Sequence, residues 1–184
     1  MKLLAISGSL RAASLNTSVL HAARRLAPEG VGIELFEGID RLPFFNSDLE
    51  SGHLPEQVAH FRAATAAADG LLISSPEYAR GVSGVMKNAL DWLVGSEDFP
   101  GKPVALINTS PRATAALAAL RLTLETMSAR LIENASITLP LLGTAHDADS
   151  IAADPELARA LRHALENFVR GIAALNPASL PSRA

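Results

Sequence analysis

The segment KLLAISGSLRAASLN, residues 2–16, decides the fold of this chain. It begins with an apolar run at residues 3–6, which is typical of a strand buried on both faces of a sheet. Residues 7–16 then contain few apolar side chains. Beyond them, residues 17–27 place Leu20, Ala23 and Ala27 on one helical face. The segment therefore predicts a strand, a polar loop and a helix.

The polar loop has the residue types of an anion site. The start of a helix presents unpaired backbone N–H groups and the positive end of the helix dipole. Arg11 supplies a charged fork that matches a phosphate, and Ser9 and Ser14 supply short donors. The loop has neither the GxGxxG nor the GxxxxGK[ST] pattern. Two interpretations stay open: a phosphate cradle, or a turn capped by Ser14 or Asn16.

The rest of the chain repeats the strand and helix alternation. Apolar runs recur at residues 32–36, 70–74, 104–108 and 137–139, and helical patterns occur at 55–68, 85–94, 113–129 and after Asp154. This alternation predicts an α/β fold with a parallel sheet and helices on both faces. We expect one domain over residues 1–184, with a frayed tail at 174–184.

Composition narrows the class of protein. The chain has 184 residues, 48% of them hydrophobic, and a net charge of −3. This charge gives no reason to expect binding to nucleic acid or to an anionic membrane. The absence of cysteine excludes disulfides and thiol redox chemistry, so a redox function needs a bound cofactor. No signal-peptide core or membrane span is readable, so we expect a cytoplasmic protein.

A second loop follows the third apolar run, in the segment SSPEYARGVSGVMKNALDWL at residues 74–93. The carboxyl ends of parallel strands meet at one edge of the sheet, so this loop is expected beside the first one. Pro76 stiffens its backbone. Tyr78, the only tyrosine, could pack against a flat ring, whereas Glu77 alone is more typical of a solvated or hydrogen-bonded loop acid.

Three segments together resemble the NADPH-dependent FMN reductase family: GSLRAASLN at 8–16, LPFFNSDLE at 42–50, and PEY with GVMKNALDW within 76–92. The resemblance implies a flavodoxin-like three-layer sandwich whose five-stranded parallel sheet has the order 2-1-3-4-5. It also implies FMN as cofactor, NADPH or NADH as electron donor, and a small-molecule acceptor. Members of the family are usually homodimers or homotetramers.

The resemblance also implies the residues that contact FMN. The phosphate contacts would be Ser9, Arg11, Ser14 and Asn16, with main-chain help at Leu15 and Thr17, and the ring contacts would be Pro76, Glu77, Tyr78, Ala79 and Ser110. It implies no catalytic side chain and no metal ligand. The chain departs from the family at Ala79, where asparagine is common, and at 108–117, where glycines are common. Arg80 and Arg112 could meet dinucleotide phosphates or an anionic acceptor, or be surface residues.

Three functions are compatible with these observations. The first is an enzyme that passes hydride from NAD(P)H through FMN to quinones, flavins or other acceptors by a ping-pong mechanism. The second is a non-catalytic electron carrier of the flavodoxin type, and the third is a phosphate-binding protein without flavin. The run from His146 to Asp149 is interpreted as a polar loop rather than a metal site, and the residues around Ser83 do not form GxSxG.

Overall fold

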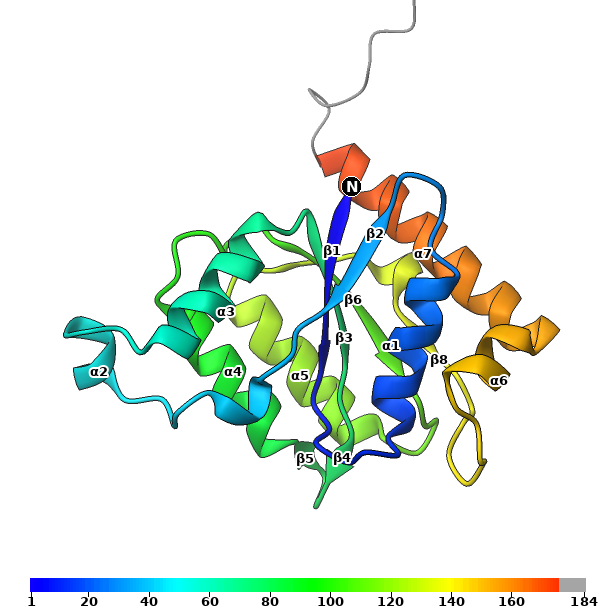
Figure 1. The fold of residues 1–184 in the computed structure, drawn as a ribbon, viewed down its shortest axis with the longest axis horizontal. Helices are drawn as coiled ribbons and strands as arrows, with labels where there is room; N and C mark the ends of the chain where they lie inside the picture. Colours follow the sequence, from blue (N-terminus) through cyan, green and yellow to red (C-terminus); the bar gives the residue numbers. More distant parts are fainter. Residues whose placement is uncertain (176–184) are drawn as a thin grey trace, which may run out of the picture.

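A twisted parallel sheet forms the centre of the molecule in the computed structural model, which describes residues 1–175 (Figure 1). Its strands are β1 (Lys2–Ser7), β2 (Gly32–Leu35), β3 (Gly70–Ser74), β6 (Pro103–Asn108), β7 (Arg130–Leu131) and β8 (Ile137–Thr138). They lie in the order β2-β1-β3-β6-β7, and β8 also pairs with β6. The expected flavodoxin-like order is confirmed, but two short strands share the fifth position.

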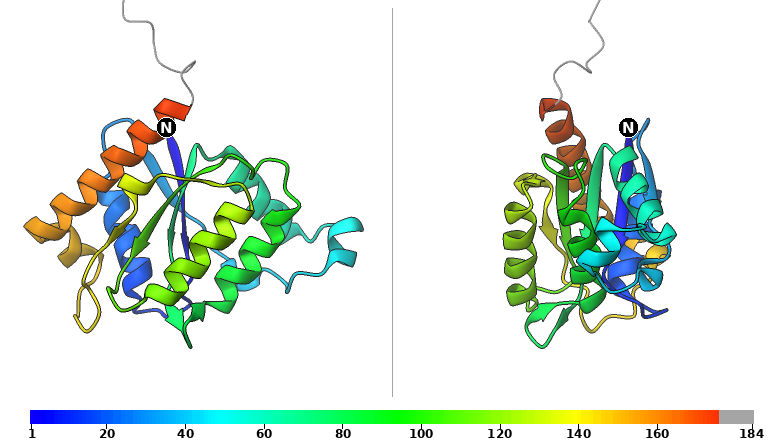
Figure 2. Two further views of the ribbon diagram at one scale, coloured as in Figure 1. Left: turned by 180° about the vertical axis from the view of Figure 1, so that it is seen from behind. Right: turned by 90° about the vertical axis from the view of Figure 1, so that its left-hand side faces the viewer.

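Helices cover both faces of the sheet (Figure 2). They are α1 (Leu15–Arg25), α2 (Ser47–Ser51), α3 (Glu56–Ala67), α4 (Gly84–Val94), α5 (Thr114–Thr126), α6 (Ala148–Ala153) and α7 (Pro155–Leu175), with short 3₁₀ turns η1 (Ile39–Arg41) and η2 (Glu133–Ala135). Helices α1, α6 and α7 pack on one face, and α3, α4 and α5 pack on the other. The short helices α2 and α6 were not predicted.

The apolar runs form strands because both faces of the sheet are buried. Every residue of β3 and β6 is buried. Side chains alternate along β1, so that Leu3 and Ala5 join the core under α1 and α7 while Leu4 and Ile6 join the core under α3 and α4. The central strands therefore hold the loops at their carboxyl ends in fixed positions.

A two-stranded hairpin, which the sequence did not predict, projects from the carboxyl edge of the sheet. It consists of β4 (Glu77–Tyr78) and β5 (Gly81–Val82). Its turn residues, Ala79 and Arg80, both have positive φ angles of 50° and 61°. Such turns usually contain Asn-Gly, which is why the Ala-Arg pair gave no hairpin signal.

The last helix ends at the limit of the described residues. It begins at Pro155 after Asp154, whose carboxylate accepts hydrogen bonds from the amides of Glu156 and Leu157, as predicted. Of the expected frayed tail, residues 174 and 175 belong to α7 and residues 176–184 lie outside the described part. Within residues 1–175, no helix has both the length and the apolar composition needed to cross a bilayer.

Candidate functional site

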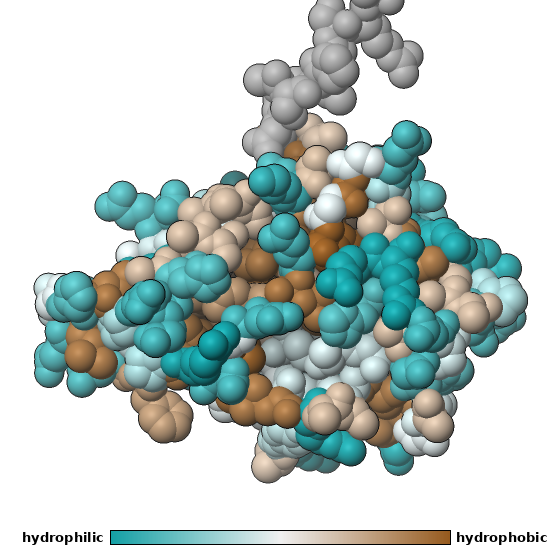
Figure 3. Space-filling model, viewed as in Figure 1, coloured by the Kyte–Doolittle hydropathy of each residue, from teal (hydrophilic) through white to brown (hydrophobic). Residues whose placement is uncertain are grey.

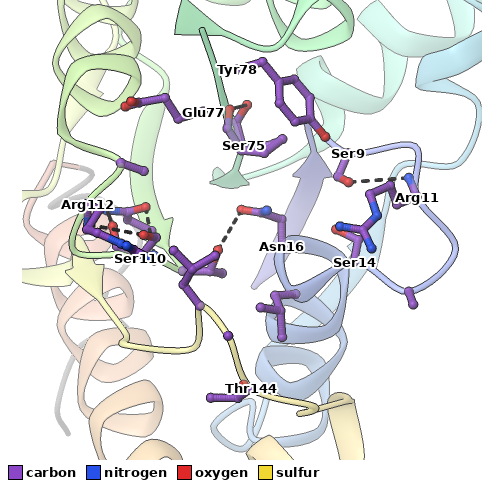
Figure 4. Close-up of a pocket in the computed structure, with 18 residues that line it drawn as sticks. Ser9, Arg11, Ser14, Asn16, Ser75, Glu77, Tyr78, Ser110, Arg112 and Thr144 are labelled. Carbon is purple, nitrogen blue, oxygen red and sulfur yellow. Dashed lines mark hydrogen bonds between the residues drawn. The ribbon is translucent and has the colours of Figure 1, made fainter. Parts of the chain in front are cut away.

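A cavity of about 490 Å³ opens at the carboxyl end of the sheet (Figure 4). Residues from four segments line it: 9–16 after β1, 75–78 after β3, 108–113 at the end of β6 and beyond it, and 142–144 after β8. It lies at the point where strand order reverses between β1 and β3, which is where open α/β sheets bind ligands. Its volume is in the range of small-molecule sites.

Hydroxyl groups shape the loop between β1 and α1. The Ser9 amide donates to Ser7 Oγ at 3.3 Å, and the Arg11 amide lies 3.5 Å from Ser9 Oγ. Ser7 Oγ in turn bonds with Thr17 Oγ1 at 2.8 Å. A Cβ atom on Gly8 would collide with the side chain of Ser75, so glycine allows the first two loops to approach closely. Polar bonds thus replace apolar anchors in this loop.

The N-terminus of α1, which is the end of a helix that attracts anions, faces the cavity. Ser14 is its N-cap, and the Ser14 hydroxyl accepts a hydrogen bond from the Thr17 amide at 3.3 Å. The Leu15 and Asn16 amides, which precede the first intrahelical bond, have no acceptor among the described residues. Arg11 is exposed on the same wall. This wall therefore combines a positive charge, free N–H groups and a helix dipole.

A buried polar cluster fixes Asn16 between the two walls of the cavity. Asn16 Oδ1 accepts a hydrogen bond from Thr109 Oγ1 at 3.3 Å, and Ser74 Oγ lies 2.9 Å from the same oxygen. All three side chains are buried. The amide oxygen is engaged in the protein, so the amide nitrogen of Asn16 is the group left to donate to a ligand. Figure 4 shows this residue at the centre of the cavity.

The side chain of Glu77 connects the hairpin to helix α5, which follows the third of the lining segments. Its Oε2 accepts a hydrogen bond from the Ala116 amide in the first turn of α5 at 2.9 Å. Ala113, the N-cap of α5, has no side chain that could do this. The Glu77 carboxylate therefore acts as a distant cap and faces the positive end of the α5 dipole. The residue predicted as a ring contact is held by the protein itself.

The loop between β6 and α5 is held by one buried amide. Asn108 Nδ2 donates to the Ser110 carbonyl at 2.7 Å, and Asn108 Oδ1 accepts from the Ser110 amide at 3.3 Å. The Arg112 amide then donates to Ser110 Oγ at 3.2 Å. Arg112 lines the cavity on the wall opposite Arg11 (Figure 4). The loop thus presents a second positive charge from a fixed backbone.

The predicted site residues gather at this cavity, with two exceptions. Thr17 lies one helical position further and bonds with Ser7, and Ala79 lies in the turn of the hairpin; neither lines the cavity. The prediction missed Ser75, Asn108 and Thr109, although all three follow or end a buried strand at the carboxyl edge. It also missed residues 142–144, which carry no recognisable motif.

Asp147 and Ser83, which belong to the two other sequence patterns considered as sites, stabilise helix ends. Asp147 caps α6 through a reciprocal capping box with Ser150, and Asp149 forms an ion pair with Arg25 of α1. The Ser83 hydroxyl caps α4 by accepting a hydrogen bond from the Met86 amide. These side chains have structural partners and lie outside the cavity lining.

Comparison with known proteins gives the same assignment as the motifs. The model of the NADPH-dependent FMN reductase family matches residues 1–141. The chain is 42% identical over 112 residues to an NAD(P)H-dependent FMN reductase of Pseudomonas aeruginosa, and the match covers 60% of each chain. It is also 42% identical over 113 residues to a 2-hydroxy-1,4-benzoquinone reductase of a Burkholderia species, covering 60% of this chain and 61% of that one.

A solved structure extends the likeness beyond these matches, which span about 60% of the length of the curated relatives. The flavoenzyme NAD(P)H:(acceptor) oxidoreductase FerB of Paracoccus denitrificans superimposes with a TM-score of 0.76 at 29% identity. The superposition covers 94% of this chain and 97% of FerB. The family model matches residues 1–141 of the 184, which include three of the four segments that line the cavity, so the chain belongs to the NADPH-dependent FMN reductase family.

Proposed function

We propose that this protein binds FMN in the cavity and uses it to pass electrons from NADPH or NADH to a small organic acceptor. The observation that carries the proposal is the wall formed by Arg11 and the N-terminus of α1. This wall offers a positive charge and free amides to a phosphate monoester. When bound, FMN would supply a ring that accepts hydride from the dinucleotide and gives electrons to the acceptor.

The residues present fit both ends of FMN. At the phosphate end, Ser9 and Arg11 would contact the phosphate together with the amides of Leu15 and Asn16. At the ring end, Pro76 and Tyr78 would border the flat ring. Tyr78 is 54% exposed, so its ring is available to pack against a ligand. A cavity that is open to solvent leaves room for donor and acceptor to bind in turn, which supports ping-pong kinetics.

The names of the relatives support an acceptor class. One is a reductase of FMN, and the other is a reductase of a hydroxylated benzoquinone. We therefore favour quinones and flavins as acceptors. A non-catalytic electron carrier would bind FMN equally well, but it would not sustain turnover of NADPH with a quinone.

We also propose that the chain forms a homodimer or a homotetramer. Phe44, in the segment before α2, is 89% exposed. Leu49 and Val94 are also exposed, and they lie near each other because the side chain of Glu50, next to Leu49, lies against Gly95, next to Val94. Apolar side chains project from the lower left of the molecule in this region (Figure 3). Burying Phe44 in a subunit contact would remove this apolar surface from water. Light scattering should give an oligomer mass that Phe44→Ser reduces.

A reconstitution experiment tests the proposed function. The protein is mixed with FMN or with riboflavin, freed of unbound flavin, and treated with NADPH in the absence of oxygen. We expect FMN to be retained more strongly than riboflavin, because only FMN carries the phosphate, and the flavin band to bleach. A quinone should then restore the band and sustain NADPH oxidation. Failure to retain FMN contradicts the proposal, and retention of FMN without bleaching by NADPH and without turnover supports the electron carrier.

A further inference from the structure

The cavity carries a second positive charge in addition to the one at the proposed phosphate end. Its charged lining residues are Arg11, Glu77 and Arg112. Glu77 is engaged by the Ala116 amide, and Arg112 takes part in none of the ion pairs found within residues 1–175. A chain with a net charge of −3 thus places two arginines on opposite walls of one cavity.

The two arginines lie on opposite sides of the space that a ligand would occupy. If the phosphate lies against Arg11 and the α1 N-terminus, and the ring lies against Ser110 as the family resemblance implies, Arg112 of the same loop lies beside the ring. The chemistry that FMN would supply when bound is uptake of a hydride, which carries two electrons and one proton and would leave one negative charge on a neutral ring. A fixed cation near that ring therefore interacts with the reduced form and much less with the oxidised form.

We propose that Arg112 is the charge that sets the reduction potential of the bound flavin. This inference rests on the proposed function. The loop supports the role because Asn108 bonds to both backbone groups of Ser110, and Ser110 Oγ accepts from the Arg112 amide. The backbone at the base of the Arg112 side chain is thereby fixed before any ligand binds, so the positions open to its charge are limited to this wall of the cavity.

Three variants separate this role from its alternatives. Arg112→Gln removes the charge and keeps a polar side chain, whereas Arg112→Lys keeps the charge. Arg80→Gln is the matched control, because Arg80 is also an exposed arginine but lies in the hairpin turn, outside the cavity lining. Each variant is loaded with FMN, and its midpoint potential is measured by equilibration with a dye of known potential. Affinities for oxidised and reduced FMN are measured in parallel.

We expect R112Q to bind reduced FMN about tenfold more weakly relative to oxidised FMN. For a two-electron couple this corresponds to a midpoint potential lower by about 30 mV. R112K should stay close to the wild-type potential, and R80Q should match the wild type. Thermal unfolding of R112Q should be unchanged, since Arg112 is exposed and its side chain has no hydrogen-bond or ion-pair partner within the described residues.

Two results would overturn the inference. FMN-loaded R112Q with the wild-type potential overturns it while leaving the proposed function intact. If that variant, with its unchanged potential, also shows a raised KM for NADPH but not for NADH, Arg112 contacts the 2′-phosphate of the dinucleotide. A wild-type protein that retains no FMN overturns both the inference and the proposed function.

Discussion

Arg11 lies in the loop between β1 and α1, where hydroxyl bonds from Ser7 and Ser9 shape the backbone. Its guanidinium shares the cavity wall with the free amides at the start of α1. Arginine suits this position because its planar fork can donate two parallel hydrogen bonds to one phosphate. At the scale of the residue, the binding site therefore consists of one charge and several short donors on a fixed loop.

Replacing Arg11 by alanine should weaken FMN binding and spare riboflavin binding. A charge-assisted hydrogen bond contributes about 1.5–3 kcal/mol, so the Kd for FMN should rise about 10- to 100-fold. Quenching of flavin fluorescence measures both affinities. Arg159→Ala, on an exposed position of α7, is the control and should bind FMN normally. Equal losses of FMN and riboflavin affinity would show that Arg11 does not contact the phosphate.

His21 in α1 should make the protein less stable as the pH falls. Burial lowers the pKa of His21 below its ordinary value of 6.5, and the charges of Arg24 and Arg25 lower it further, against an opposing effect of Glu37. The unfolded chain then binds the proton more tightly than the folded chain. His21 therefore costs no stability above about pH 6.5. As the pH falls from there through the folded pKa of His21, the free energy of unfolding decreases.

The substitution His21→Gln tests this pH dependence. Urea unfolding at about pH 7.5 and about pH 5.5 should show a smaller loss of stability for H21Q than for the wild type, because glutamine does not titrate in this range. Other groups that titrate contribute equally to both proteins, so the difference between them isolates His21. Parallel curves for the two proteins would rule out this role for His21.

At the scale of the element, α5 depends on other segments at its start and on backbone bonds at its end. Glu77 of the hairpin caps its first turn. At its end, the Ser128 amide donates to the Glu125 carbonyl and the Ala129 amide donates to the Leu124 carbonyl, each at 2.9 Å. These two bonds form a Schellman motif, which requires a left-handed residue after the cap. Ser128 fills that position with φ of 64°.

Ser128→Gly should therefore stabilise the protein. A Cβ atom is unfavourable in the left-handed region, and glycine removes this cost, so the free energy of unfolding should rise by about 1 kcal/mol. The midpoint of urea unfolding measures the change. Ser128→Ala retains the Cβ and should leave the stability nearly unchanged. A stabilisation by alanine as large as that by glycine would mean that the hydroxyl, not the backbone angle, is unfavourable.

At the scale of the whole molecule, the cavity exists only when loops from distant parts of the chain come together. Asn16 meets Thr109 across 93 positions of sequence, and Gly8 meets Ser75. Unfolding separates these segments and destroys the site. A ligand of the cavity must therefore bind the folded state in preference to the unfolded state.

FMN should accordingly raise the stability of the protein. At a free concentration of about 100 times its Kd, FMN should add about 2.7 kcal/mol to the free energy of unfolding. Denaturant unfolding of flavin-stripped and FMN-loaded protein measures this difference. Riboflavin at the same concentration should add less, since it lacks the phosphate. No shift with FMN, in protein shown to retain it, would place the flavin outside the folded cavity.

Much of the fold was readable because burial leaves a clear pattern. The central strands appeared as continuous apolar runs, since neighbouring helices cover both faces of β1, β3 and β6. The Asp154 cap was also readable, because the residues that form it are adjacent in sequence. The β4–β5 hairpin was missed since Ala79 and Arg80 are unusual turn residues, and the fifth strand position is divided by η2.

The sequence alone determined the strand and helix alternation, the polar loop at residues 7–16 and the family, because these depend on residue types at short spacing. Only the tertiary structure decided that Glu77 caps α5, that Thr109 holds Asn16, and that Arg11 and Arg112 occupy opposite walls. The physical reason is that each of these relations joins segments from different strand ends. Their partners are set by the order and register of the strands, which no short stretch of sequence specifies.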